Sequence, residues 1–170
     1  MEKVSNIEEA KEKVLTDMNT FLSSVRDFSA ENVTDLSLGL SKLRNIRSSV
    51  YENLNQIQHE YLILQGLMWL NENDHAPKNV RWYWNPRQTG DASEPDLRGI
   101  LNGEVIISAE ATTSEKPQGV IDTRMKNTLA KLEVMPGDKY YFIRTPSMRQ
   151  RANTKIKNNG WHISVVSLEG

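Results

Sequence analysis

The 170-residue chain contains no cysteine. This absence excludes a disulfide framework, a zinc ribbon and a cysteine nucleophile, and it is typical of reducing compartments, so we expect a cytoplasmic protein. Long hydrophobic runs are also missing. The longest, Tyr61 to Leu70, contains Gln65 and Gly66 and falls far short of the roughly 20 apolar residues that span a bilayer. The first residues, MEKVSNIEEAKEK, have no apolar core. We therefore expect neither a signal peptide nor a membrane association.

Several catalytic and cofactor-binding motifs are absent as well. The sequence contains no GxGxxG, GxxxxGK[ST], GxSxG or HExxH pattern. Those patterns build dinucleotide sites, P-loops, hydrolase nucleophile elbows and zinc proteases, respectively. Their absence leaves these four classes unsupported.

The first part of the chain has the period of helices. Over residues 6–28, apolar residues recur at steps of three and four, and Asn6 or Ser5 could cap this helix. Residues 33–48 predict a second helix, and residues 49–70 predict a third helix or a continuation of the second. Residues 1–76 carry 7 Lys and Arg against 12 Asp and Glu. We expect this acidic helical region, residues 1–76, to pack on or extend a core formed by residues 77–170.

The rest of the chain alternates strand and helix patterns. Strands are predicted at 80–84, 96–101, 104–112, 139–144 and 161–168, and helices at 118–134 and 147–158, with a loop at 85–95. Asn102 and Gly103 lie between two strand patterns, which is a strong signal for a β-hairpin. The predicted fold class is α/β, a mixed sheet flanked by helices and preceded by a helical segment.

Two acidic residues stand near the same end of this hairpin. With a two-residue turn at Asn102-Gly103, Asp96 lies opposite Ala109; a longer loop or one bulge moves it opposite Glu110. In the second register the two carboxylates share a face of the sheet. Carboxylates this close repel unless a cation lies between them or one is protonated. Oxygen ligands of this kind suit Mg²⁺ or Mn²⁺.

Pro95-Asp96, the hairpin, Glu110-Ala111-Thr112, and the helix and strand that follow resemble the PD-(D/E)xK nuclease superfamily. The resemblance implies a restriction-endonuclease-like fold and Mg²⁺-dependent cleavage of phosphodiester bonds. It also implies that Asp96, Glu110 and the backbone carbonyl of Ala111 hold the metal.

An acidic residue of the preceding helix often assists in this family, which indicates Glu60 first and Glu52 second. His59 could also lie near the metal.

The family's lysine position is occupied by Thr112. In viral cap-snatching endonucleases, which belong to this superfamily, the lysine comes from the helix that follows. The resemblance therefore implies that Lys126 on that helix, or Lys116 in the connector, supplies the missing amine. The alternative is that Thr112 marks lost catalysis and that all these cations are solvated surface charges.

Residues 116–157 carry 10 Lys and Arg against 3 Asp and Glu. A basic segment of this kind could bind the phosphates of a nucleic acid. The candidates are Arg124, Arg144, Arg149, Arg151 and Lys155. Trp82, Tyr83 and Trp84 could stack on bases, or could pack beneath the N-terminal helices.

Two functions follow from the sequence. The first is a metal-dependent endonuclease acting on DNA, of restriction or mobile-element type, which could dimerise through its N-terminal helices. The second is a catalytically inactive module of the same fold that binds nucleic acid or a protein partner.

Overall fold

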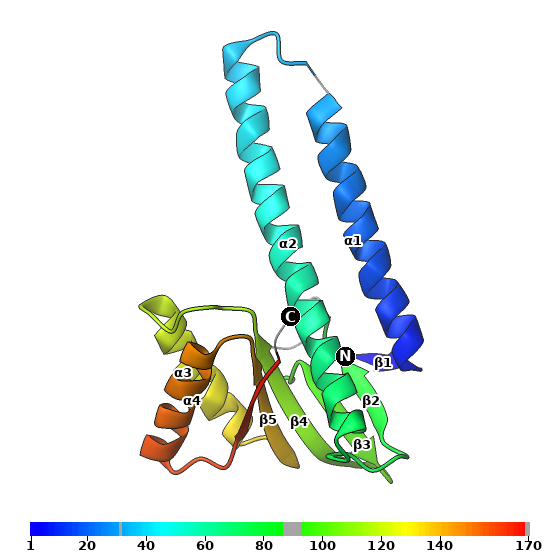
Figure 1. The fold of residues 1–170 in the computed structure, drawn as a ribbon, viewed down its shortest axis with the longest axis vertical. Coiled ribbons are helices and arrows are strands. Elements are labelled where there is room, and N and C mark those ends of the chain that lie inside the picture. The colour runs from blue at the N-terminus through cyan, green and yellow to red at the C-terminus, as the bar shows by residue number, and fades with distance from the viewer. Residues whose placement is uncertain (31, 87–92, 169–170) are drawn as a thin grey trace.

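A computed structural model of the chain describes residues 1–30, 32–86 and 93–168. A helical hairpin projects from a body built around one sheet (Figure 1). Within these residues the strands are β1 (Glu2–Val4), β2 (Arg81–Trp84), β3 (Leu97–Leu101), β4 (Glu104–Thr112), β5 (Asp138–Ile143) and β6 (Ser164–Ser167). The helices are α1 (Ile7–Ala30), α2 (Leu36–Glu72), α3 (Val120–Glu133) and α4 (Pro146–Asn159). The α/β class is confirmed. The predicted loop at 85–95 lies in part outside the described residues.

The two long helices begin at side-chain caps. Asn6 accepts a hydrogen bond from the Glu9 amide at 2.7 Å, and Asp35 accepts one from the Leu38 amide at 2.9 Å. The patterns at 33–48 and 49–70 form one continuous helix, α2, so the second pattern is the continuation of the first. No proline or glycine lies between Leu40 and Gln65 to interrupt it. None of the helices in the described part of the chain is both long and apolar enough to cross a membrane.

The sheet follows the chain order from β1 to β6. The strands β1 to β4 pair antiparallel, whereas β4, β5 and β6 pair parallel. The parallel strands are connected through α3 and α4, as parallel pairing requires. The edge strand β1 was not predicted, because three residues are too few to show an alternating pattern. It belongs to the region 1–76, so that region contributes directly to the sheet.

Two hydrophobic cores lie on the two faces of the sheet. One joins the C-terminal half of α2 and the start of α1 to the sheet through residues such as Leu67, Ile107 and Phe142. Trp82 and Trp84 belong to this core, so they pack beneath the helices. The other joins α3 and α4 to the sheet through residues such as Leu129, Tyr141 and Met148. Because both faces are covered, β4 is buried on both sides at Ser108 and Ala109.

The β3–β4 hairpin contains both a two-residue turn and a bulge. Asn102 (φ 53°) and Gly103 (φ 89°) form a two-residue turn, with Leu101 opposite Glu104. A bulge then shifts the register next to Gly99, so Leu97 lies opposite Ala109. Asp96, one residue before Leu97, is thereby brought to the level of Glu110.

Candidate active site

A pocket of about 530 Å³ opens where α2, β4 and α3 meet. Asp96 and Glu110 lie in its wall, with Ala111 and Thr112 from β4 and Arg124 from α3. Both carboxylate residues are nearly buried, each with an exposed fraction of 6%. The bulge and the pocket together bring two acidic side chains into one partly enclosed space.

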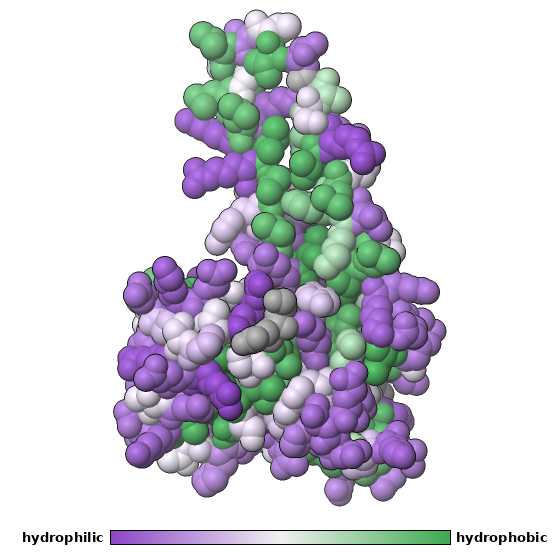
Figure 2. Space-filling model, in the orientation of Figure 1, coloured by the Kyte–Doolittle hydropathy of each residue, from purple (hydrophilic) through white to green (hydrophobic). Residues whose placement is uncertain are grey.

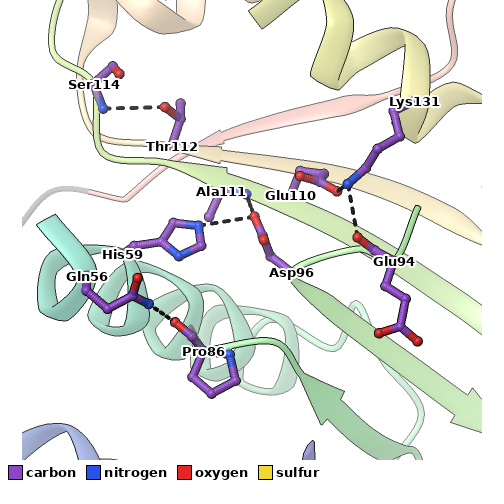
Figure 3. A network of polar contacts seen from close by, with 10 residues as sticks. All are labelled: Gln56, His59, Pro86, Glu94, Asp96, Glu110, Ala111, Thr112, Ser114 and Lys131. Atoms are coloured by element: carbon purple, nitrogen blue, oxygen red, sulfur yellow. Dashed lines mark hydrogen bonds and ion pairs between the residues drawn. The ribbon is translucent and has the colours of Figure 1, made fainter. Parts of the chain in front are cut away.

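The carboxylate of Asp96 is held from two sides. Its Oδ2 accepts a hydrogen bond from the Ala111 amide at 2.8 Å, and it lies 3.2 Å from Nε2 of His59 (Figure 3). Both contacts use the same oxygen. The amide of Ala111 belongs to β4, so the backbone beside Glu110 orients the Asp96 side chain directly.

Glu110 forms an ion pair with Lys131, which is not among the lysines predicted from the sequence. The Nζ of Lys131 on α3 lies 2.6 Å from Oε1 of Glu110 and donates a hydrogen bond to the backbone carbonyl of Glu94 at 3.0 Å (Figure 3). Lys131 therefore connects the second carboxylate to the segment before β3. The helical spacing held a signal for it. Arg124 and Thr128 line the pocket, and Lys131 follows them at seven and three residues, on the same side of α3.

The lysines predicted from the resemblance do not occupy the position beside Glu110. Lys126 and Lys116 are both exposed, and neither lines the pocket. Lys126 precedes Lys131 by five residues on α3. At 100° per residue it points to another side of the helix. Thr112 is part of the pocket wall, and its Oγ1 accepts a hydrogen bond from the Ser114 amide at 3.4 Å.

The α2 wall of the pocket is a polar stripe. Glu52, Asn55, Gln56 and His59 all line the pocket. They are spaced at zero, three, four and seven residues, which places them on one side of a helix. Gln56 also donates a hydrogen bond to the carbonyl of Pro86. This spacing is visible in the sequence, and it predicts that Glu52 and His59 lie on the same side of the helix.

The structure places Glu60, the first candidate for an assisting carboxylate, elsewhere. Neighbouring helical residues point about 100° apart, so His59 and Glu60 cannot face the same way. Glu60 is fully buried, does not line the pocket, and lies 3.7 Å from Nζ of Lys13 on α1. It belongs to the contact between the two long helices, and His59 is the α2 residue that contacts Asp96.

The cations predicted to bind phosphate fall into two groups, those that are accessible and those that are paired with Asp122. Arg124 lines the pocket and is exposed, Arg144 is half-buried and Arg149 is exposed. Arg151 instead forms a two-point ion pair with Asp122 at 2.7 and 3.0 Å, and Lys155 lies 3.0 Å from the same carboxylate. In this conformation Asp122 neutralises part of the basic segment.

Burial and neighbouring charges shift the pKa values of Glu110 and His59. Burial and the negative charge of Asp96 raise the pKa of Glu110 to about 8, against the opposing effect of Lys131. Burial lowers the pKa of His59, but the hydrogen bond and charge of Asp96 and the charge of Glu110 outweigh it, so this pKa is raised overall. The two groups thus share a tendency to hold a proton when no other cation is present.

The side chains of the pocket supply only some of the oxygen ligands that a hard divalent cation needs. Among the residues that the structure describes, no cluster of three or more His, Asp or Glu side chains is arranged around one point. Mg²⁺, however, commonly binds to one or two carboxylates and keeps several waters. The two carboxylates of Asp96 and Glu110 in the pocket wall meet that requirement. Burial and the negative charge of Asp96 raise the pKa of Glu110, and a bound cation would offset that charge.

Comparisons with protein-family models, curated proteins and solved structures gave no match to this chain.

Proposed function

We propose that this protein is a metal-dependent nuclease that hydrolyses phosphodiester bonds, with DNA as its substrate. The observation that carries the proposal is the pair Asp96 and Glu110 in the wall of one pocket, with the amine of Lys131 beside Glu110. Lys131 lies 2.6 Å from Glu110, and the β-bulge brings Asp96 to the level of the same residue. Two buried carboxylates with an adjacent amine suit a reaction in which a water attacks phosphorus. The proposal includes a restriction-endonuclease-like fold.

Asp96, Glu110 and the backbone carbonyl of Ala111 would hold Mg²⁺ or Mn²⁺. The metal would supply charge for the phosphoryl oxygens and a more acidic bound water. The Ala111 amide and His59 hold the Asp96 carboxylate in place through Oδ2. A carboxylate whose rotamer is fixed in this way loses little further freedom when it binds a cation.

Lys131 has the role that the family assigns to its motif lysine. Its amine contacts Glu110 and would replace the motif lysine that is absent at position 112. There it would orient the attacking water and stabilise negative charge as the P–O bond breaks. Arg124, which lines the same pocket, would contact the phosphate backbone.

The test is cleavage of supercoiled and linear DNA, and of structured RNA, with Mg²⁺, Mn²⁺ or EDTA. Glu110→Gln is the test variant and Glu104→Gln its matched control, because Glu104 is an exposed residue of the same strand. We expect metal-dependent DNA cleavage that the first variant loses and the second retains. Cleavage of RNA alone would keep the nuclease and overturn the choice of DNA.

The alternative function, an inactive binding module, has its own outcome in this experiment. It gives nucleic-acid binding without cleavage under any metal condition, and equal binding by wild type and Glu110→Gln. The position of Lys131 argues against it, since an amine is present at the carboxylate pair although residue 112 is a threonine.

A further inference from the structure

The projecting hairpin has a hydrophobic face that nothing in the described chain covers. Figure 2 shows hydrophobic side chains gathered along both helices and over the tip of the hairpin. Of the seven exposed leucines of α1 and α2, six share one side of the hairpin, with exposed fractions from 42% for Leu54 to 92% for Leu36; the others of this group are Leu15, Leu22, Leu40 and Leu43. Single exposed leucines are ordinary, but a contiguous group marks an interaction surface.

Helical geometry places these leucines on one side of the hairpin. Leu15 and Leu22 are seven residues apart, so they lie on one side of α1. Leu36, Leu40 and Leu43 follow steps of four and three on α2, and Leu54 continues the same stripe. On each helix an exposed leucine directly follows a residue at the packed side, as Leu15 follows Val14 and Leu40 follows Gly39. Because the helices are antiparallel, the same rotation on both brings the two stripes to one common face.

This face points away from the sheet. On α2 the buried residues Ile63 and Leu70 pack toward the sheet, and Leu54 is separated from that side by roughly half a turn of the helix. Leu38 of the same helix is 71% exposed but lies on the opposite side from Leu36 and Leu40. The leucine face, defined here as these six leucines, is therefore a distinct surface from both the pocket and the core.

We propose that the leucine face binds the same face of a second copy of this chain, so that two hairpins form a four-helix bundle. A hairpin of two antiparallel helices with one apolar side is half of such a bundle, and steps of three and four suit its packing. A second copy offers an identical stripe, as a two-fold interface requires. The six leucines expose between 42% and 92% of their surfaces, and apolar side chains of this kind form the core of a standard interface, which buries about 800 Å² per partner.

Charge favours a protein partner over a lipid surface. Residues 1–76 carry 7 basic against 12 acidic residues, whereas helices that lie on anionic membranes are rich in Lys and Arg. The dimer does not depend on the proposed nuclease activity, because no leucine of the face lines the pocket.

The test is the molecular mass of the full chain by sedimentation equilibrium over low to high micromolar concentrations. Wild type is expected to be a dimer. The double variant Leu22→Glu/Leu43→Glu is expected to be a monomer, because the dissociation constant of the dimer should rise at least about 100-fold. Leu38→Glu is the matched control, with similar exposure on the other side of α2, and is expected to remain a dimer. Helical content and thermal unfolding by circular dichroism show whether each variant is folded.

Three results would overturn the proposal. They are a wild-type monomer at the highest concentration, a dimer that survives the double substitution in a folded protein, and equal loss of the dimer in the Leu38→Glu control. Co-sedimentation of a wild-type monomer with anionic vesicles, lost in the double variant, would assign the face to lipid instead.

Discussion

The amine of Lys131 lies 2.6 Å from the carboxylate of Glu110, and the same amine donates to the carbonyl of Glu94 just before Asp96. One side chain of α3 thus contacts both segments that carry the acidic pair. The site is assembled from three elements that are distant in sequence: α2, the β3–β4 hairpin and α3.

The first prediction concerns this lysine. Lys131→Met should lower DNA cleavage by about 100- to 1,000-fold, the cost of removing one preorganised charge from a transition state. Binding of Mn²⁺, followed by calorimetry, should persist because the carboxylates remain. Lys126→Met and Lys116→Met should leave the rate unchanged, since both residues are exposed and lie outside the pocket. Loss of cleavage in Lys126→Met with full activity in Lys131→Met would reverse the assignment.

The second prediction concerns pH and Glu110. Its pKa is raised to about 8 in the folded protein from an ordinary value of 4.5. Between these values the folded state holds a proton that the unfolded state has released, so stability from this group falls as pH rises. Urea unfolding in EDTA should show a loss on the order of 1–3 kcal/mol from pH 5 to pH 8.

The Glu110→Gln variant isolates this effect, because it keeps the shape and cannot ionise. Its profile should be flatter than that of wild type over the same pH range. The raised pKa of His59 acts in the same direction. Its hydrogen bond and charge interaction with Asp96 remain in the variant although the Glu110 charge is lost, so some slope should survive. Identical wild-type and variant profiles would show that Glu110 is ionised throughout.

The third prediction concerns Asp122, which pairs with Arg151 and Lys155. Hydrogen bonds from these two cations hold the pKa of Asp122 far below its ordinary value. Its contribution to stability is therefore present above the unfolded pKa of 3.8 and is lost as pH falls through the folded pKa. Asp122→Asn should lower the urea midpoint at pH 7, and the difference from wild type should narrow toward pH 2.

The same variant tests the basic segment. Asp122→Asn releases Arg151 and Lys155 from their shared partner, so DNA affinity should rise. The slope of log affinity against log salt should steepen by about 1 for each cation that engages a phosphate. An unchanged slope in a fluorescence-anisotropy titration would place both residues outside the DNA interface.

The fourth prediction concerns close packing between α2 and β5. A methyl group at Gly66 would lie 2.5 Å from the ring of Phe142, which is 1% exposed and has little room to move. Gly66→Ala should therefore destabilise the protein by about 1–2 kcal/mol net, because overpacking outweighs the better helix propensity of alanine. The exposed helix substitution Ser48→Ala is the control in urea unfolding. A Gly66→Ala protein as stable as wild type would show that Phe142 can shift.

The sequence on its own determined the local structure and the identity of the acidic pair. Period and capping predicted the helical first part, and Asn102-Gly103 predicted the hairpin, because turn chemistry and side-chain period act over a few residues. The bulge next to Gly99 was one of two open alternatives, since a local pattern does not fix strand register. Only the tertiary structure placed Lys131 beside Glu110, placed His59 rather than Glu60 beside Asp96, and paired Arg151 with Asp122. Those choices depend on which side of a helix meets the sheet and at what height, and that is set by packing between elements far apart in the chain.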